Sequence, residues 1–337
     1  TSGSAVTYNG TTFATSADAS ISGLTVGKGA GAVSSNTAVG ASALSSNSTG
    51  AFNSAFGVSA LAATTTNSNT AFGYLAAAAT TTGTGVVAVG RLALNSNTTG
   101  NYHTAVGEAA LYSNTTGTQN TAVGDTALYS NTTGNYNTGI GMYALQANTT
   151  ASNNTAVGYQ AGYSNTTGGR SSFFGYQAGY SNNTAFANSA FGDSALYSNT
   201  TGAGNNAFGY FALYANTTGV ANTAIGGEQY GVVDAAMRFN TTGSYNTAIG
   251  VSALKSNTTA SYSTAIGYRA GYSYNRTSDS DGVNLFAGAN AGYSTNTGNY
   301  NTFVGGINSG YFITTGSKNT ILGNYTGNNG GLDIRTA

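Results

Sequence analysis

The sequence has no cysteine, no proline and no tryptophan, and its 337 residues include only nine basic and nine acidic side chains. Without cysteine there are no disulfides, thiolate metal sites or thiol nucleophiles. The balanced and sparse charge leaves no basic stripe to neutralise phosphates, so we expect no nucleic-acid binding. No stretch approaches 18 consecutive apolar residues, and we therefore expect no membrane insertion.

Catalytic and metal-binding groups are equally scarce. The single histidine, His103, stands at a position that asparagine holds in most repeats, so we interpret it as a satisfied or solvent-facing substitution. Asp279 and Asp281 form a local acidic pair, a weak candidate for a calcium site that lacks the later ligands of an EF-hand loop. We expect neither an enzyme nor a bound cofactor.

What the sequence does have is repetition. A core motif Asn-Thr-Ala-φ-Gly, in which φ is Val, Ile or Phe, recurs along almost the whole chain. Twelve of the sixteen intervals between its final glycines are 17 residues, and the others are 16, 24, 21 and 18. These glycines are Gly40, Gly57, Gly73, Gly90, Gly107, Gly124, Gly141, Gly158, Gly175, Gly192, Gly209, Gly226, Gly250, Gly267, Gly288, Gly305 and Gly323. A short structured unit repeated at a fixed period is typical of a solenoid.

The residue types of the unit predict short strands and turns. Alternation in Thr121-Ala122-Val123 places Thr121 and Val123 on one face of a strand of about four or five residues. We expect the φ column to form the core, because it is apolar at every level, and the column of Leu128 to be a second interior column. The column of Ala127 is held so small that it indicates a close approach, either across a thin coil or between subunits. Ser-Asn-Thr-Thr-Gly is turn chemistry, and the asparagines that open the units can form amide ladders. The fold class we predict is all-β, a parallel β-roll or β-helix solenoid of about seventeen coils.

The positions at which the motif begins, ends and is interrupted by insertions divide the chain into three parts. Residues 1–35 lack it and are expected to form an N-terminal cap or junction, residues 36–323 form the solenoid, and residues 324–337 leave it. Insertions are expected at 227–245 and 273–283, where loops of a solenoid often present a binding face. We expect the chain to be an internal piece of a longer protein.

Two sets of side chains are candidates for contacts with other molecules. The insertions supply the candidate receptor-facing residues Tyr230, Asp234, Arg238 and Arg276. A tyrosine recurs five residues after the repeat glycine, which predicts an aromatic ladder that serves either mutual stacking or glycan contact. The ladder residues are Tyr112, Tyr129, Tyr163, Tyr180, Tyr197 and Tyr214.

Ten sequons of the Asn-Thr-Thr or Asn-Ser-Thr type also recur, from Asn47 and Asn97 to Asn257. They are either glycan acceptors in a secretory pathway or simply the residues that the turn requires.

The repeat from Asn154 to Gly168 resembles the repeats of bacteriophage tail-fibre proteins. The flanks Gly23–Gly27 and Gly331–Arg335 resemble the flanks of those regions, and the core motif is similar to the head repeats of trimeric autotransporter adhesins. The resemblance implies a homotrimer, which a column of small alanines makes plausible on its own, and a virion or extracellular location.

The function we predict is a non-catalytic shaft segment of a phage tail fibre that spaces or presents binding to a host cell-surface glycan or protein. A bacterial surface adhesin or extracellular matrix fibre makes the same physical demands and stays an alternative. An ice-binding solenoid is the third, because threonines such as Thr104, Thr121, Thr138 and Thr155 recur at coil spacing.

Overall fold

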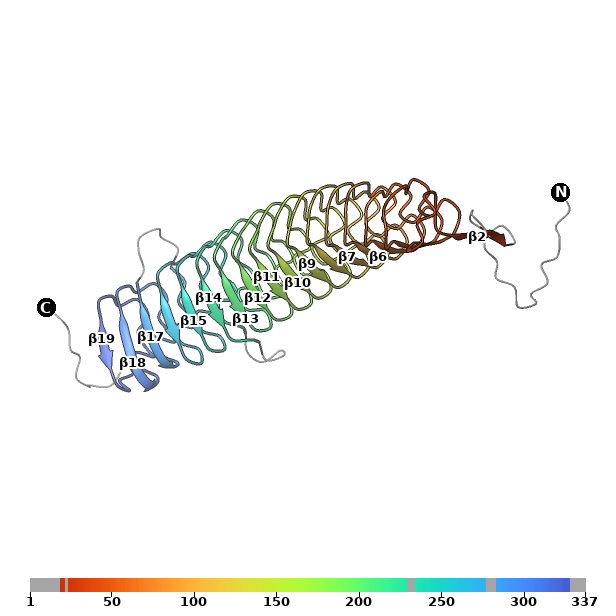
Figure 1. The fold of residues 1–337 in the computed structure, drawn as a ribbon. Helices are drawn as coiled ribbons and strands as arrows, with labels where there is room; N and C mark the ends of the chain where they lie inside the picture. The colour runs from red at the N-terminus through yellow and green to blue at the C-terminus, as the bar shows by residue number, and fades with distance from the viewer. Residues whose placement is uncertain (1–18, 22–23, 229–233, 277–282, 328–337) are drawn as a thin grey trace, which may run out of the picture.

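The structure, a computed structural model, describes residues 19–21, 24–228, 234–276 and 283–327. It is a long, gently curved stack of coils without a helix in the described residues (Figure 1). The strands are β1 Ala19–Ile21, β2 Leu24–Gly27, β3 Thr37–Val39, β4 Ser54–Phe56, β5 Thr70–Phe72, β6 Val87–Val89, β7 Thr104–Val106, β8 Thr121–Val123, β9 Thr138–Ile140, β10 Thr155–Val157, β11 Ser172–Phe174, β12 Ser189–Phe191, β13 Asn206–Phe208, β14 Thr223–Ile225, β15 Thr247–Ile249, β16 Thr264–Ile266, β17 Leu285–Ala289, β18 Thr302–Ile307 and β19 Thr320–Leu322.

Each coil contributes one strand to a single sheet. Strands β3 to β19 pair in parallel and in chain order, and equivalent residues stand side by side, as Thr121 does beside Thr138. The predicted parallel β-solenoid is therefore confirmed. Most strands have three residues, which is shorter than the four or five expected, because a glycine with positive φ ends them.

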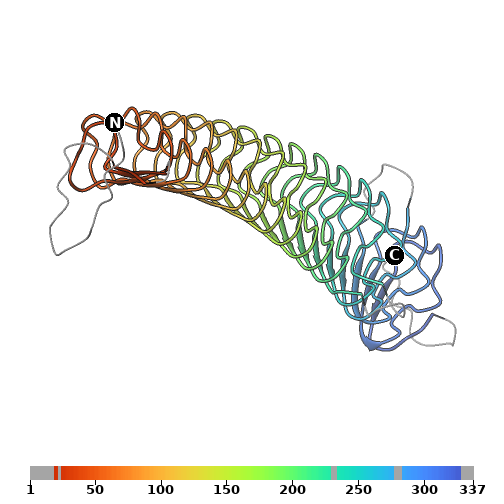
Figure 2. The ribbon, with the colours of Figure 1, turned by 90° about the vertical axis from the view of Figure 1, so that its right-hand side faces the viewer.

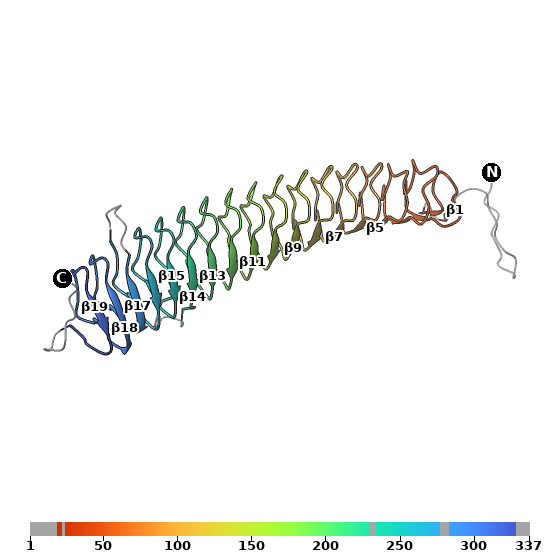
Figure 3. The same ribbon diagram turned by 60° about the vertical axis from the view of Figure 1, so that its left-hand side comes forward.

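The sheet lies on one side of the coils and the turns lie on the other (Figure 3). Seen from the side, the stack bends into an arc, with the strands along its inner edge (Figure 2). At its N-terminal end, β1 and β2 pair as an antiparallel hairpin, and β2 pairs antiparallel with β3. This hairpin occupies the edge of β3 that no coil covers, as expected of a cap.

The core is built from small residues. The second residue of each strand from β3 to β19 is buried, usually an alanine such as Ala122, and the second alanine and the leucine of the unit, Ala127 and Leu128, are buried with it. The predicted interior leucine column is confirmed. The Ala127 column lies inside the coil, so of the two close approaches expected for it the one across a thin coil is correct, and it offers no flat face to another chain. The strand alanines were expected on the face opposite the core, and that placement was wrong.

The φ column was placed on the wrong side of the strand. Val123 and its equivalents point outward, and Ile140 is 40% exposed. The reason is that the coil is thin. At Gly139, an added methyl would already lie 3.3 Å from Leu128 Cγ and 3.2 Å from the carbonyl oxygen of Ala144. Where a leucine faces the strand across the coil, as it does here, only an alanine-sized side chain fits inside, so the larger residue takes the outer face.

The repeat glycines are required by backbone geometry. Gly124 has φ of 130°, and a Cβ on it would lie 2.6 Å from the carbonyl carbon of Gly141 in the next coil. Both the dihedral and the close approach exclude any other residue.

Candidate functional surfaces

Asparagine ladders run through the interior. The turn asparagines are fully buried, and each one from Asn114 to Asn257 donates its Nδ2 to the Oδ1 of the turn asparagine in the preceding coil, as Asn148 does to Asn131 at 2.7 Å. Nine such bonds connect Asn97 to Asn257 without a break. The prediction of amide ladders is confirmed, although the side-chain-to-side-chain ladder lies mainly in the turn column. The opening asparagines bond chiefly to the backbone of the next coil, as Asn120 does to Gly134 O at 2.8 Å.

Burial of the turn column also bears on the sequons. The acceptor amides of Asn47, Asn97 and Asn257 are all inside the coil and donate to backbone carbonyls there. A glycosylated amide could not occupy this position, so the turn requirement accounts for these residues in the folded chain.

His103 is buried in the opening-asparagine column. Its Nε2 lies 2.8 Å from Gly117 O, and its Nδ1 accepts a hydrogen bond from the backbone N–H of Asn120 at 3.2 Å. The ring therefore replaces an asparagine amide bond for bond, as a neutral Nε2–H tautomer. Desolvation by burial lowers its pKa to about 4, and the two backbone hydrogen bonds oppose that shift only partly. Of the two interpretations that the sequence left open, a satisfied and a solvent-facing substitution, the structure shows the satisfied one.

The six predicted ladder tyrosines form two stacked runs, and Tyr272, Tyr293 and Tyr311 stack as a third run further along the chain. Tyr112 stacks on Tyr129, Gln146 then interrupts the column, and Tyr163 begins the longer run. In that run, Tyr180 stacks on its neighbours with centroids 5.1 and 5.0 Å apart and rings nearly parallel, and the run ends at Tyr214.

Stacking determines which parts of the tyrosine rings another molecule could contact. Each ring inside the run has both faces covered by neighbouring rings, so edges and hydroxyls rather than faces meet the solvent. Partial burial raises the pKa of Tyr197, and the neighbouring Tyr180 and Tyr214 raise it further by a smaller amount. Glycan binding by this column would require a sugar ring to pack flat against a tyrosine, and no ring face is free inside the run. The rings instead stack on one another throughout the run.

The first insertion is shorter than the predicted range 227–245. Ala236 already donates its N–H to Gly226 O, and Asn240 Nδ2 donates to Asn216 Oδ1 at 2.8 Å, so the chain is back in coil register at Ala236. Of the predicted receptor-facing residues, Tyr230 lies outside the described residues, as do Asp279 and Asp281 of the second insertion. Arg276 stands at the edge of that insertion, where its carbonyl accepts a hydrogen bond from Thr259.

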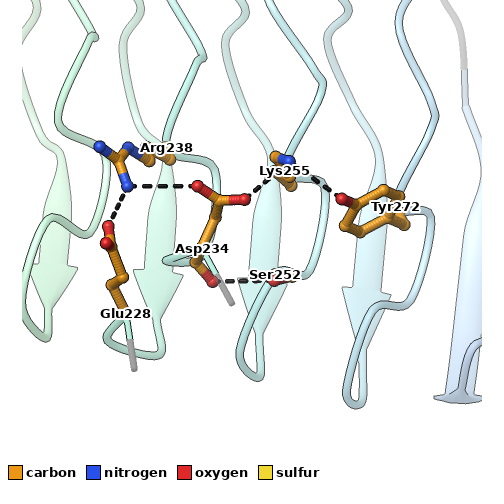
Figure 4. A network of polar contacts seen from close by, with 6 residues as sticks. All are labelled: Glu228, Asp234, Arg238, Ser252, Lys255 and Tyr272. Carbon is orange, nitrogen blue, oxygen red and sulfur yellow. Dashed lines mark hydrogen bonds and ion pairs between the residues drawn. The ribbon is translucent and has the colours of Figure 1, made fainter. Parts of the chain in front are cut away.

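Asp234 and Arg238 belong to a polar cluster at the first insertion (Figure 4). Arg238 pairs with Glu228 and, at 3.2 Å, with Asp234, whose other carboxylate oxygen lies 2.7 Å from Lys255 Nζ. Ser252 Oγ donates to the backbone carbonyl of Asp234 at 2.9 Å. The residues on either side of the inserted segment are thus tied to each other and to the next coil.

Lys255 and its partner Tyr272 were not predicted as members of this cluster. Lys255 Nζ donates to the hydroxyl of Tyr272 at 2.9 Å. Burial, the largest single influence, lowers the pKa of Lys255, but the hydrogen bonds and charges of Asp234 and Tyr272 together raise it. The sequence signal for this cluster lies in the tyrosine column. Once the insertion is discounted, Arg238 and Lys255 occupy that column between Tyr214 and Tyr272.

The outer face of the sheet is a third surface. The outward positions of β3 to β19 hold mostly threonine or serine, with Val, Asn and Leu once each, on one column and Val, Ile, Phe, Leu or Ala on the other, and none of them is charged. Phe174, Phe191 and Phe208 stack on one another along it, 4.8 and 4.9 Å apart. We call this surface the outer sheet face.

Within the described residues, no group of three His, Cys, Asp or Glu side chains could hold a metal ion, and no helix is long and apolar enough to cross a membrane. Fold and surfaces together define the chain as a parallel β-solenoid with asparagine ladders inside and an uncharged sheet face outside. No family model, curated protein or solved structure matches it.

Proposed function

We propose that this chain is a non-catalytic structural segment of an extracellular or virion fibre, of the tail-fibre shaft type, in which copies assemble as a homotrimer through the outer sheet face. The observation that supports this is the uncharged, largely apolar column that runs the length of the sheet, with Ile225 and Ile266 40% and 44% exposed. Soluble monomers rarely leave so long an apolar patch open to water.

The partner that best fits this face is another copy of the chain. The face repeats once per coil, and a solenoid with the same repeat presents matching threonine and φ columns at the same spacing. Because the outer positions carry no charge, association would rest on apolar burial rather than on electrostatic steering.

Light scattering of the purified chain tests this proposal. We expect a mass near three chains, and we expect Ile140→Lys combined with Ile249→Lys to give a single-chain mass with the β-sheet circular dichroism unchanged. Thr116→Lys, on an exposed turn away from the sheet, is the matched control and should leave the assembly intact. A single-chain mass for the unaltered protein would reject the homotrimer.

The location of the fibre needs a separate measurement. A bacterial adhesin or matrix fibre would have the same architecture, so mass spectrometry of a virion preparation distinguishes them. Peptides of this chain in purified virions support the tail-fibre assignment, and their presence only on a bacterial surface supports the adhesin.

Ice binding remains a second candidate, because the threonines turn out to face outward. The outer sheet face carries four threonines in register, Thr104, Thr121, Thr138 and Thr155. We had expected these threonines to share a face with the core, and they do not. Thermal hysteresis that disappears in Thr121→Lys would support this function. Its absence at high protein concentration would dismiss it.

A further inference from the structure

A shallow groove of about 340 Å³ lies on the side of the solenoid, halfway along its length. Its walls come from three consecutive coils, in the segments that precede β10, β11 and β12, and none of its lining residues belongs to a strand. The groove is therefore separate from the outer sheet face, and it is equally separate from the polar cluster at the first insertion.

The groove exists because one side chain is missing from a polar column. Two residues before the opening asparagine, the two immediately preceding coils carry side chains that accept backbone hydrogen bonds. Asn135 Oδ1 accepts from Thr118 N at 2.7 Å, and Ser152 Oγ accepts from Asn135 N at 3.0 Å. The next coil has Gly169 at this position, which offers no side chain, and the one after has Phe186.

Phe186 differs from most of the aromatic residues on the solenoid. Its column neighbours are Gly169 and Ala203, and no ring among the described residues stacks on it, whereas Tyr180 and Tyr197 cover each other. The side chain is 58% exposed. A ring face that is electron-rich and open to solvent can pack against the C–H groups of a sugar ring.

Arg170 supplies a cation on the wall of the same groove. It is exposed, and the ion pairs among the described residues involve Arg91, Arg238 and Lys255 rather than Arg170. A guanidinium presents two parallel N–H groups that match a carboxylate. Thr150, Thr167 and Asn153, which carry hydroxyl and amide groups, line the groove together with these two residues.

We propose that this groove binds a carboxylate-bearing saccharide, with a sugar ring against Phe186, its carboxylate on Arg170 and its hydroxyls on Thr150, Asn153 and Thr167. An open groove encloses too little of a small molecule to hold it tightly, but a polysaccharide can lie across it and extend beyond. The proposal does not depend on the fibre function or on the number of chains in the assembly.

Isothermal titration of the full chain with four probes tests the proposal. The probes are hexamers of galacturonate, hyaluronan and sialate, together with the methyl ester of the galacturonate hexamer as a neutral match. We expect at least one acidic hexamer to bind, and Arg170→Gln to weaken that binding about tenfold or more. Arg170→Lys should recover only part of it, and Phe186→Ala should weaken acidic and esterified forms alike.

Two controls and three contrary results complete the test, and the last of these results uses hexaglutamate as an additional probe. Arg91→Gln and Phe52→Ala remove the same side-chain types elsewhere on the surface and should leave binding unchanged, with thermal unfolding verifying every variant. Failure of all three acidic hexamers to bind overturns the proposal, as does equal binding by Arg170→Gln. Equal or tighter binding of hexaglutamate, lost in Arg170→Gln but kept in Phe186→Ala, would make the groove a general anion contact and reject a saccharide site.

Discussion

The ring of Phe173 fills the space that a side chain at Gly162 would need: a Cβ built on Gly162 would lie 2.7 Å from Cδ2 of Phe173. The same ring blocks Gly179 in the next coil, at 2.3 Å from Cδ1. Both glycines stand where other coils carry leucine, with the same left-handed backbone, φ +60° against +51° at Leu145. One phenylalanine has therefore replaced an alanine and two leucine side chains together, and Phe286 does the same between Gly271 and Gly292.

This exchange predicts a rescue. Phe173→Ala should lower the free energy of unfolding by about 3–5 kcal/mol, because it leaves a cavity with no leucine to fill it. Adding Gly162→Leu and Gly179→Leu restores the composition of neighbouring coils and should recover most of the loss. Gly162→Leu in the unaltered chain should destabilise it through the clash. Thermal unfolding measures all three, and a triple variant no more stable than Phe173→Ala would show that the ring is not exchanged for the leucines.

The asparagine ladder predicts a dependence on position. Asn148→Ala removes the donor to Asn131 Oδ1 and the acceptor of Asn165 Nδ2, and it should cost about 3 kcal/mol. Asn257 ends the ladder, because the next coil has Tyr274 in this column, and its Oδ1 has no partner.

Asn257→Ala breaks a single side-chain bond of the ladder and should therefore cost about 1 kcal/mol less than Asn148→Ala. Chemical denaturation of both variants checks this order. Equal losses would mean that the ladder acts as independent side-chain-to-backbone bonds.

Much of the architecture follows from the period. Glycines at 17-residue spacing, turn residues and the absence of helical patterning predicted a parallel solenoid, and the leucine column was assigned correctly to the interior. The φ column was not, because alternation shows which residues share a face but not which face is inside. That depended on the width of the coil, set by leucine opposite alanine across a narrow interior, and this width is not visible in any single repeat.

Surface sites were harder to predict for a related reason. The insertions drew attention to Asp234 and Arg238, but their partners Lys255 and Tyr272 lie in otherwise ordinary repeats, one and two coils further on. Arg170 and Phe186 each depart from the usual residue of their column, and only the stacking of coils brings them to one groove. Departures from the repeat unit, sorted by column, are the signal that could have found them.

The polar cluster predicts a salt-sensitive contribution to stability. Asp234→Asn weakens the pairs with Arg238 and Lys255, which are partly buried, and should lower the free energy of unfolding by about 1 kcal/mol at low ionic strength. Glu108→Gln breaks the exposed pair with Arg91 and should change stability much less. Urea unfolding at low and high salt separates the two. An Asp234→Asn effect no larger than that of Glu108→Gln would leave the cluster without a role in anchoring the insertion.

His103 predicts how stability responds to acid. Burial lowers its pKa to about 4 in the folded chain, against 6.5 in an unfolded one. Between these values the unfolded state binds a proton that the folded state does not, so stability is fully present above pH 6.5 and falls as the pH drops towards 4. The span corresponds to about 3 kcal/mol. Protonation of Nδ1 would also set an N–H against the N–H of Asn120, which now donates to it.

His103→Asn should remove this acid sensitivity. Asparagine makes the equivalent bonds in neighbouring coils, as Asn120 does to Gly134 O and Asn137 N, and it does not titrate. The variant should match or exceed the unaltered chain at pH 7 and lose much less stability between pH 6.5 and 4. Urea unfolding across that range measures both slopes. If the two chains lose stability in parallel, the acid response originates in carboxylates elsewhere, and His103 carries its proton in the folded state as readily as in the unfolded one.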